Sequence, residues 1–165
     1  DGRMEVFRLR NFWDLSAAEG LEIGASYAAN LAGRDVLEWQ EREQAAVAAA
    51  DLTYKWKPPQ RALYRSFLLQ AEVLRSSASS YGWYALAQYQ LGRRWYVAAR
   101  YDWTQLPTSD DLAEAGPGVT LSFLPSEFSR LRVQWRRIWG GTEPPQHRVD
   151  AQVSFGLGPH KPHVF

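Results

Sequence analysis

Apolar side chains recur at every second position along much of this chain, and residues 20–31 are the clearest case. Their apolar set, with small or polar residues between its members, is Leu21, Ile23, Ala25, Tyr27, Ala29 and Leu31. Successive side chains of a β-strand point to opposite faces, whereas helical faces recur about every 3.6 residues. The segment is therefore predicted to be a strand with one apolar face and one small or polar face.

The same alternation predicts eight further strands. The alternating segments are 7–15, 20–31, 46–56, 67–73, 83–91, 95–103, 119–123, 131–135 and 149–157. We expect the strands that contain them to be about as long as the roughly 9–11 residues that cross a bilayer at a tilt. The predicted fold class is all-β: an antiparallel up-and-down transmembrane β-barrel with about nine strands visible.

Aromatic residues concentrate near the strand ends on the apolar face. The chain has 8 tryptophans and 8 tyrosines, yet its mean hydropathy is −0.42. No run approaches the roughly 18 apolar residues of a membrane-spanning helix, so a helical membrane protein is not predicted. Tryptophans predicted at the two membrane–water interfaces are Trp13, Trp56, Trp83, Trp95, Trp103 and Trp135. The alternative interpretation is that tryptophan and tyrosine simply favour strands.

Connections between the predicted strands alternate in length. Tight, turn-like connections are expected after the first, third, fifth and seventh strands, at residues 16–20, 57–61, 91–93 and 124–127. Polar connections are expected after the other strands, at residues 32–45, 76–80, 105–115 and 140–147, of which 76–80 is the shortest. Outer-membrane barrels have short periplasmic turns and longer external loops, so the alternation assigns the two sides of the membrane.

With nine strands, the first strand would begin on the outside of the membrane and the last strand would end on the periplasmic side. A bacterial single-chain barrel has an even number of strands, and an open edge in lipid would leave backbone groups without partners. The chain is therefore predicted to be the C-terminal part of a larger barrel. Further strands would come from the same protein upstream of Asp1 or from other subunits. The alternative is an error in the strand count.

The polar face of the predicted strands is rich in charge, which suits a water-filled lumen because burying an unpaired charge is costly. Residues predicted to line the lumen are Arg8, Arg10, Lys55, Lys57, Arg94, Arg100, Asp102, Arg130, Arg132 and Arg136. The excess of basic groups suggests a weak preference for anionic solutes. Ion-pair ladders that hold the wall together are an equally good explanation.

Other chemistry is sparse. The chain lacks cysteine and its formal net charge is +1, which gives no ground for a thiolate metal site or a nucleic-acid partner. No catalytic motif occurs, so the protein is not predicted to be an enzyme and no cofactor is expected. His160 and His163 would need a third ligand to bind a metal, and an exposed tail is the preferred interpretation.

The end of the chain carries a family resemblance. Its last alternating segment, Val149-Asp150-Ala151-Gln152-Val153-Ser154-Phe155-Gly156-Leu157-Gly158, and the terminal Phe165 resemble the C-terminal segment of Gram-negative outer-membrane β-barrel proteins, including porin-like barrels. The resemblance implies a bacterial outer-membrane location, contact with outer-membrane lipid, and recognition of Phe165 by the barrel-assembly machinery. Residues 1–158 would form barrel strands and 159–165 a periplasmic tail, because Pro159 and Pro162 interrupt the alternation.

Three functions are compatible with such a barrel. The leading one is a porin-like channel for passive diffusion of small hydrophilic solutes. The alternatives are the barrel of an active receptor or transporter with an upstream plug domain, and a structural barrel that anchors a protein complex. A soluble lipocalin-like or sandwich protein is the rival at the level of the fold.

Overall fold

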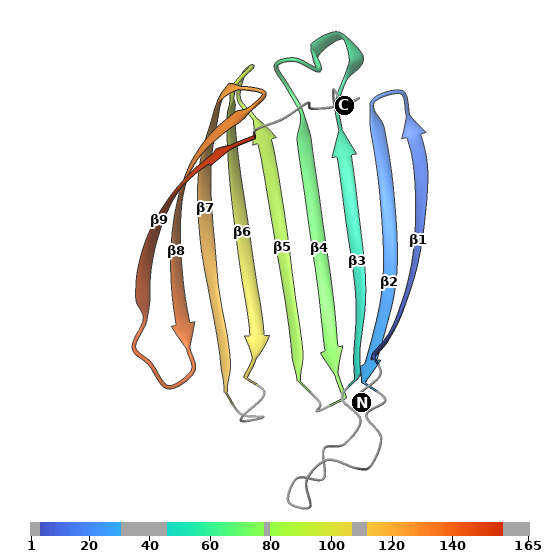
Figure 1. The fold of residues 1–165 in the computed structure, drawn as a ribbon, viewed down its shortest axis with the longest axis vertical. Helices are drawn as coiled ribbons and strands as arrows, with labels where there is room; N and C mark the ends of the chain where they lie inside the picture. Colours follow the sequence, from blue (N-terminus) through green and yellow to red (C-terminus); the bar gives the residue numbers. More distant parts are fainter. Residues whose placement is uncertain (1–3, 31–45, 78–79, 107–111, 157–165) are drawn as a thin grey trace, which may run out of the picture.

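A computed structural model describes residues 4–30, 46–77, 80–106 and 112–156, which form one nine-stranded antiparallel sheet (Figure 1). Its strands are β1 (Met4–Ser16), β2 (Glu19–Asn30), β3 (Ala46–Trp56), β4 (Phe67–Ser76), β5 (Tyr81–Gln90), β6 (Trp95–Gln105), β7 (Ala113–Ser126), β8 (Ser129–Gly140) and β9 (Gln146–Phe155). Each strand pairs with its neighbour in the chain, so the order in the sheet is the order in the sequence. The predicted all-β, antiparallel, up-and-down arrangement and its nine strands are confirmed.

In two hairpins at the upper end in Figure 1, a serine hydroxyl accepts a hydrogen bond from a backbone N–H of the turn. In the β1–β2 turn, the Ser16 hydroxyl accepts a hydrogen bond from Ala18 N (3.2 Å) and contacts Glu19 Oε2 at 2.9 Å. In the β7–β8 turn, the Ser126 hydroxyl accepts from Phe128 N at 3.2 Å. Serine favours turns because its short side chain can bond to the backbone two residues on. The strand register shifts beside each turn, and each turn itself consists of two residues, 17–18 and 127–128.

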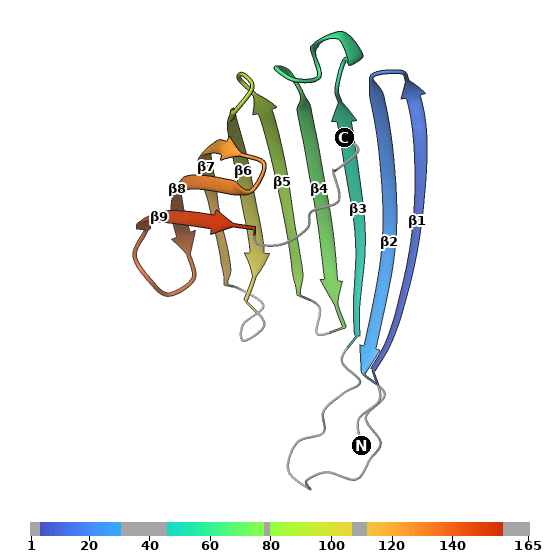
Figure 2. The ribbon, with the colours of Figure 1, turned by 45° about the horizontal axis from the view of Figure 1, so that its top comes forward.

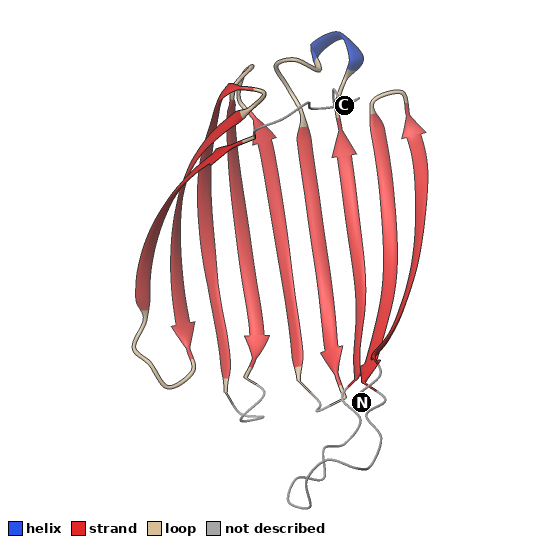
Figure 3. Ribbon diagram, in the orientation of Figure 1, coloured by secondary structure: helices blue, strands red, loops and turns tan. Residues whose placement is uncertain are grey.

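The connection after β3 is longer than predicted. Residues 57–66 separate β3 from β4, and they include a short 3-10 helix, η1 (Pro59–Arg61), which is the blue segment in Figure 3. Proline is well tolerated in a first helical turn, where its missing N–H costs little, so the two prolines start this helix rather than a tight hairpin. Gln90, only 3% exposed, anchors the connection because its side chain accepts from Ser66 Oγ and donates to the Leu63 carbonyl, both at 3.0 Å.

The predicted loop over residues 105–115 was too long. Strand β6 continues to Gln105 and β7 begins at Ala113, so the Gly116-Pro117 pair lies inside β7. Pro117 is aligned with β6 but has no register partner on β8, consistent with its missing N–H donor. A Cβ atom at Gly116 would overlap the carbonyl oxygen of Arg137 on β8. Glycine is needed here because the two backbones approach closely.

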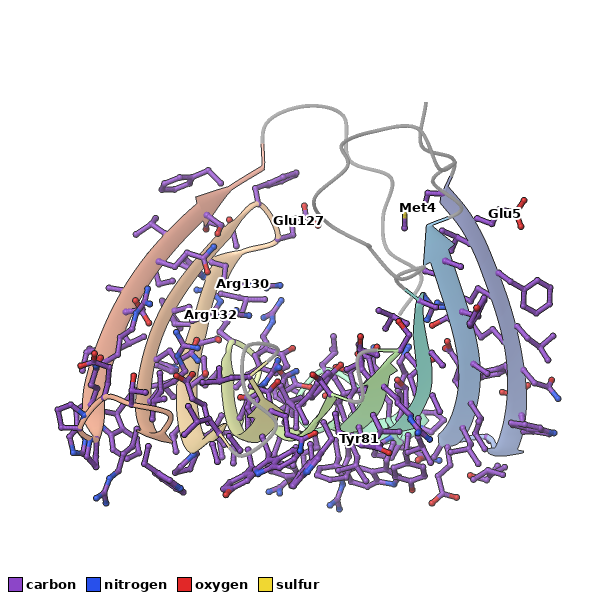
Figure 4. The ribbon with its side chains drawn as sticks, turned by 90° about the horizontal axis from the view of Figure 1, so that it is seen from below. Met4, Glu5, Tyr81, Glu127, Arg130 and Arg132 are labelled. Carbon is purple, nitrogen blue, oxygen red and sulfur yellow. The ribbon has the colours of Figure 1, made fainter. Side chains whose placement is uncertain are left out.

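The sheet is strongly curled. Figure 2 shows β7, β8 and β9 turning out of the plane of the first strands, and Figure 4 shows a trough whose side walls are β1 and β9. Within the described residues, β1 pairs only with β2 and β9 only with β8, so the sheet is open. The confirmed architecture is therefore a curled antiparallel sheet, and a closed barrel is not observed.

The two faces of the trough differ sharply. Directly paired residues of antiparallel strands share a face, and one continuous row on the concave side is Arg10, Gly24, Asp51, Glu72, Tyr84, Asp102 and Gly116. The neighbouring positions on each strand form the convex side, which is mostly apolar. Among the described residues the only buried hydrophobic side chains are Ala29 and Ala98, and no large side chain is fully buried. The sheet consequently has no conventional hydrophobic core.

Some predictions fall on residues that the structure does not describe. They concern the connection at 32–45, Leu157 at the end of the last alternating segment, His160, His163 and Phe165, and all of these lie outside the described residues.

Candidate functional site: the concave face

The concave face carries most of the residues predicted to line a lumen. The register and the strand alternation place eight of them there: Arg8, Arg10, Lys55, Arg100, Asp102, Arg130, Arg132 and Arg136. Figure 4 shows Arg130 and Arg132 inside the trough and Glu5 outside it. Lys57 and Arg94 lie in the connections after β3 and before β6, beyond the strand ends.

Charges on the β1–β3 side are compensated by neighbours. Arg8 lies 3.4 Å from Asp51 and Arg10 lies 2.8 Å from Glu22, so β1 is joined to both β2 and β3 by ion pairs. Arg8 reaches Asp51 across the intervening strand because Gly24 leaves room, and a Cβ there would overlap the Asp51 carboxylate. Cross-strand pairs of this kind contribute to sheet stability, as the ion-pair interpretation had suggested.

These pairs surround a hydrophilic cavity of about 320 Å³. Its polar lining comes from β1 to β5 and consists of Arg8, Arg10, Glu22, Asp51, Thr53, Lys55, Gln70, Glu72 and Tyr84. Such a surface is well solvated and offers both donors and acceptors to hydrated solutes.

Arg100 links the middle of the sheet. Its guanidinium donates to Asp102 two positions along β6, with Nη2 at 2.6 Å and Nε at 2.7 Å from Oδ1. It also lies over the Tyr84 ring of β5, with Cζ 4.1 Å from the ring centroid. A cation over an aromatic face is attracted by the ring quadrupole, so Arg100 is held by two partners on the concave side.

Within the described chain, the arginines of β8 have fewer charged partners than Arg8, Arg10 and Arg100. Arg136 reaches Asp150 of β9 at 3.7 Å, but Arg148 approaches the same carboxylate more closely, at 2.8 Å. Arg130 and Arg132 form no ion pair with a carboxylate among the described residues. The Nε atoms of Arg132 and Arg136 are buried without a hydrogen-bond acceptor in that part of the chain. Buried donors are usually satisfied, so these two groups stand out.

The tryptophans predicted at membrane interfaces all lie on the convex face. Trp13, Trp56 and Trp95 are at or near the upper strand ends in Figure 1, and Trp83 and Trp103 near the lower ends. Trp135 differs because it lies near the middle of β8.

Further aromatic rings extend both groups. Trp95 packs on Phe123 with ring centroids 4.6 Å apart at the upper end. Trp83 stacks on Tyr101 at 5.5 Å, and Tyr101 contacts Trp139 at 6.2 Å, at the lower end. Two aromatic bands therefore flank a stretch of alanine, valine and leucine on the convex face.

Sequence reasoning missed several concave residues, of which Tyr84, Tyr96 and Arg148 are the clearest. Tyr84 and Tyr96 were passed over because an aromatic residue suggests the apolar face, and Arg148 because it precedes the last alternating segment. Extending the two-residue alternation to the ends of each strand would have placed all three on the concave face. Among residues 4–30, 46–77, 80–106 and 112–156, no group of three histidine or carboxylate side chains has a metal-binding arrangement.

No helix in the described part of the chain is long and apolar enough to cross a membrane. Neither a protein-family model nor a curated protein sequence matches the chain. Functional inference therefore rests on the geometry of the two faces.

Proposed function

We propose that this chain forms part of the wall of a transmembrane β-barrel in a bacterial outer membrane, and that the barrel is a porin-like channel for passive diffusion of small hydrophilic solutes. The observation that carries the proposal is the division between the two faces. The convex side presents large apolar residues without cover, whereas the concave side presents charged residues and a hydrophilic cavity. A wall that needs apolar surroundings outside and water inside is characteristic of a barrel channel.

Lipid is the covering that best fits the convex face. Val133, Val149 and Phe155 are 53%, 68% and 72% exposed, and the described chain supplies no second layer to cover them. Burying an apolar side chain of this size is worth roughly 1.5–3 kcal/mol, so leaving the whole face in water would cost far more than a protein's usual stability. Acyl chains can cover such a surface without any specific partner.

The spacing of the aromatic bands supports this covering. Trp95 and Trp103 stand at opposite ends of β6, eight positions apart. At roughly 3.4 Å per residue this is about 27 Å along the strand, or about 20 Å across a bilayer at a tilt of about 40°. An outer-membrane barrel has an apolar band about 25 Å tall between aromatic girdles, so the two distances are comparable.

The proposed barrel contains more strands than the nine described. The outer edges of β1 and β9 would expose unpaired backbone groups to lipid, where water cannot satisfy them. Strands from the same polypeptide or from another subunit would join these edges and close the wall. The two-residue hairpins at the upper end suit the periplasmic side, where the barrel-assembly machinery would act, and the lower end would then face outward.

Planar-bilayer recording of the full-length protein tests this function. A folded channel should give stable open-channel currents. A cysteine introduced at Thr53, on the concave face, should reduce the current once it is coupled to a bulky maleimide. The matched control is a cysteine at Leu52, the adjacent residue on the convex face, and the chain has no cysteine of its own.

Folded protein without current would overturn the porin proposal and would favour a plugged receptor or a structural barrel. Current that is insensitive to label at both positions would show that the concave face does not line the path.

A further inference from the structure

Charge is distributed unevenly across the trough. On the concave face of β1 to β5, the described strands carry three basic residues, Arg8, Arg10 and Lys55, and four acidic ones, Asp14, Glu22, Asp51 and Glu72. On β6 to β9 they carry five basic residues, Arg100, Arg130, Arg132, Arg136 and Arg148, and three acidic ones, Asp102, Glu114 and Asp150. The first wall is nearly neutral, whereas the second has an excess of positive charge.

Three of these arginines follow one strand along the trough. Arg130 and Arg132 occupy consecutive concave positions of β8, and Arg136 follows after Gln134, so the three arginine side chains leave the same face. Because a strand advances roughly 3.4 Å per residue, the series extends over about 20 Å. Within this series only Gln134, between Arg132 and Arg136, is uncharged.

The surroundings of Arg132 favour an acceptor from outside the sheet. Its register neighbours are Ser122 on β7 and Gln152 on β9, which are neutral and able to donate hydrogen bonds. Tyr96 of β6 continues the same row. The buried Nε atoms of Arg132 and Arg136 lack acceptors within the described chain. A guanidinium has a planar fork of donors that matches the oxygens of a carboxylate or a phosphate.

Two of the three acidic groups on this wall have a closer partner than the β8 arginines. Asp102 is held by Arg100 at 2.6 Å, and Asp150 is held by Arg148 at 2.8 Å while Arg136 lies 3.7 Å away. Arg130 and Arg132 thus keep their charge available to a solute, in contrast to Arg8 and Arg10, which are paired.

We propose that Arg130, Arg132 and Arg136 form a stepwise path for small oxyanions, carboxylates and phosphate among them, along the inner face of β8. This inference rests on the proposed channel function and specifies its solute class. Each arginine binds one oxyanion weakly and releases it to the next site along the strand, since conduction requires binding that is favourable but reversible.

The test compares the wild-type channel with R130Q/R132Q in planar bilayers under an about tenfold KCl gradient. The reversal potential of the wild type should indicate anion selectivity. The double variant should lower the anion-to-cation permeability ratio by at least about twofold, because the positive potential near the arginines raises the local concentration of anions. The matched control is R137Q, a neighbouring arginine on the convex face, where its guanidinium lies 5.7 Å from the centroid of the Trp139 ring. R137Q should retain the wild-type ratio.

Inorganic phosphate provides a second readout. Added to the chloride solution, phosphate should reduce the current in the wild type, and R132Q should raise the half-blocking concentration by about tenfold, as expected for loss of a charge-assisted hydrogen bond. Open channels with equal permeability ratios in the wild type and in R130Q/R132Q would overturn the oxyanion path and leave the channel function intact. Absence of current from folded wild-type protein would overturn both.

Discussion

Val133 and Gln134 are adjacent on β8 and offer a matched pair of substitutions. Val133 lies on the convex face and is 53% exposed, whereas Gln134 lies on the concave face between Thr120 of β7 and Asp150 of β9. V133R and Q134R introduce the same side chain into the same part of the same strand. Any difference between them reports the surroundings of the two faces.

The two faces predict different costs. If the convex face contacts lipid, an arginine near the middle of a strand destabilises a barrel by about 2–4 kcal/mol, which is roughly 30-fold to several hundred-fold in the folding equilibrium. Under the same assumption Q134R places its guanidinium in water beside the Asp150 carboxylate, so we expect little loss of stability. In a water-soluble protein Val133 would remain an exposed surface position, and V133R would change the stability by only about 0.5 kcal/mol.

Reversible urea unfolding of the full-length protein in phospholipid vesicles, followed by tryptophan fluorescence, measures these differences. The expected result is a lower unfolding midpoint for V133R and a wild-type midpoint for Q134R. Equal midpoints for the two variants, or a larger loss for Q134R, would refute the assignment of the faces.

Two further substitutions test the packing of the sheet. G116A should destabilise the protein by about 1–3 kcal/mol because the new Cβ overlaps a β8 carbonyl oxygen, whereas G92A, which meets no atom within 4 Å, should be neutral in the same unfolding assay. Q90A should lower the free energy of unfolding by about 1–3 kcal/mol because it leaves two polar groups of the β3–β4 connection without their partner. Q88A, on the same face, is the control. Equal losses of stability in the two variants would show that the buried hydrogen bonds of Gln90 contribute nothing specific.

Period-two alternation was enough to predict the strands, their antiparallel order and the face of most charged residues on them. It succeeded because a sheet with one apolar and one polar side constrains every second position. The alternation could not predict which charged residues form ion pairs with one another. Arg8 pairs with Asp51 on the strand after next, across Gly24, which depends on the register of three strands. That register is set by turns and bulges whose geometry a sequence does not display.

Local breaks in the alternation caused the errors. Residues 105–115 were predicted as a loop, yet β7 begins at Ala113, and the close approach of β7 and β8 requires Gly116 within this strand. Pro58 and Pro59 indicated a tight turn, yet they begin η1 in a ten-residue connection. In both cases tertiary packing decided between conformations that the residues themselves permit.

The central claim is that the convex face contacts lipid and the concave face contacts water. Because the chain has no cysteine, single cysteines can be placed in neighbouring pairs, Thr120 with Leu121 and Gln70 with Ala71. With the full-length protein in vesicles, a water-soluble maleimide should label the cysteines at 120 and 70. A fluorophore attached before reconstitution at 121 and 71 should be quenched by brominated lipid. Uniform labelling of all four positions without lipid quenching, or the reverse alternation, would contradict the account.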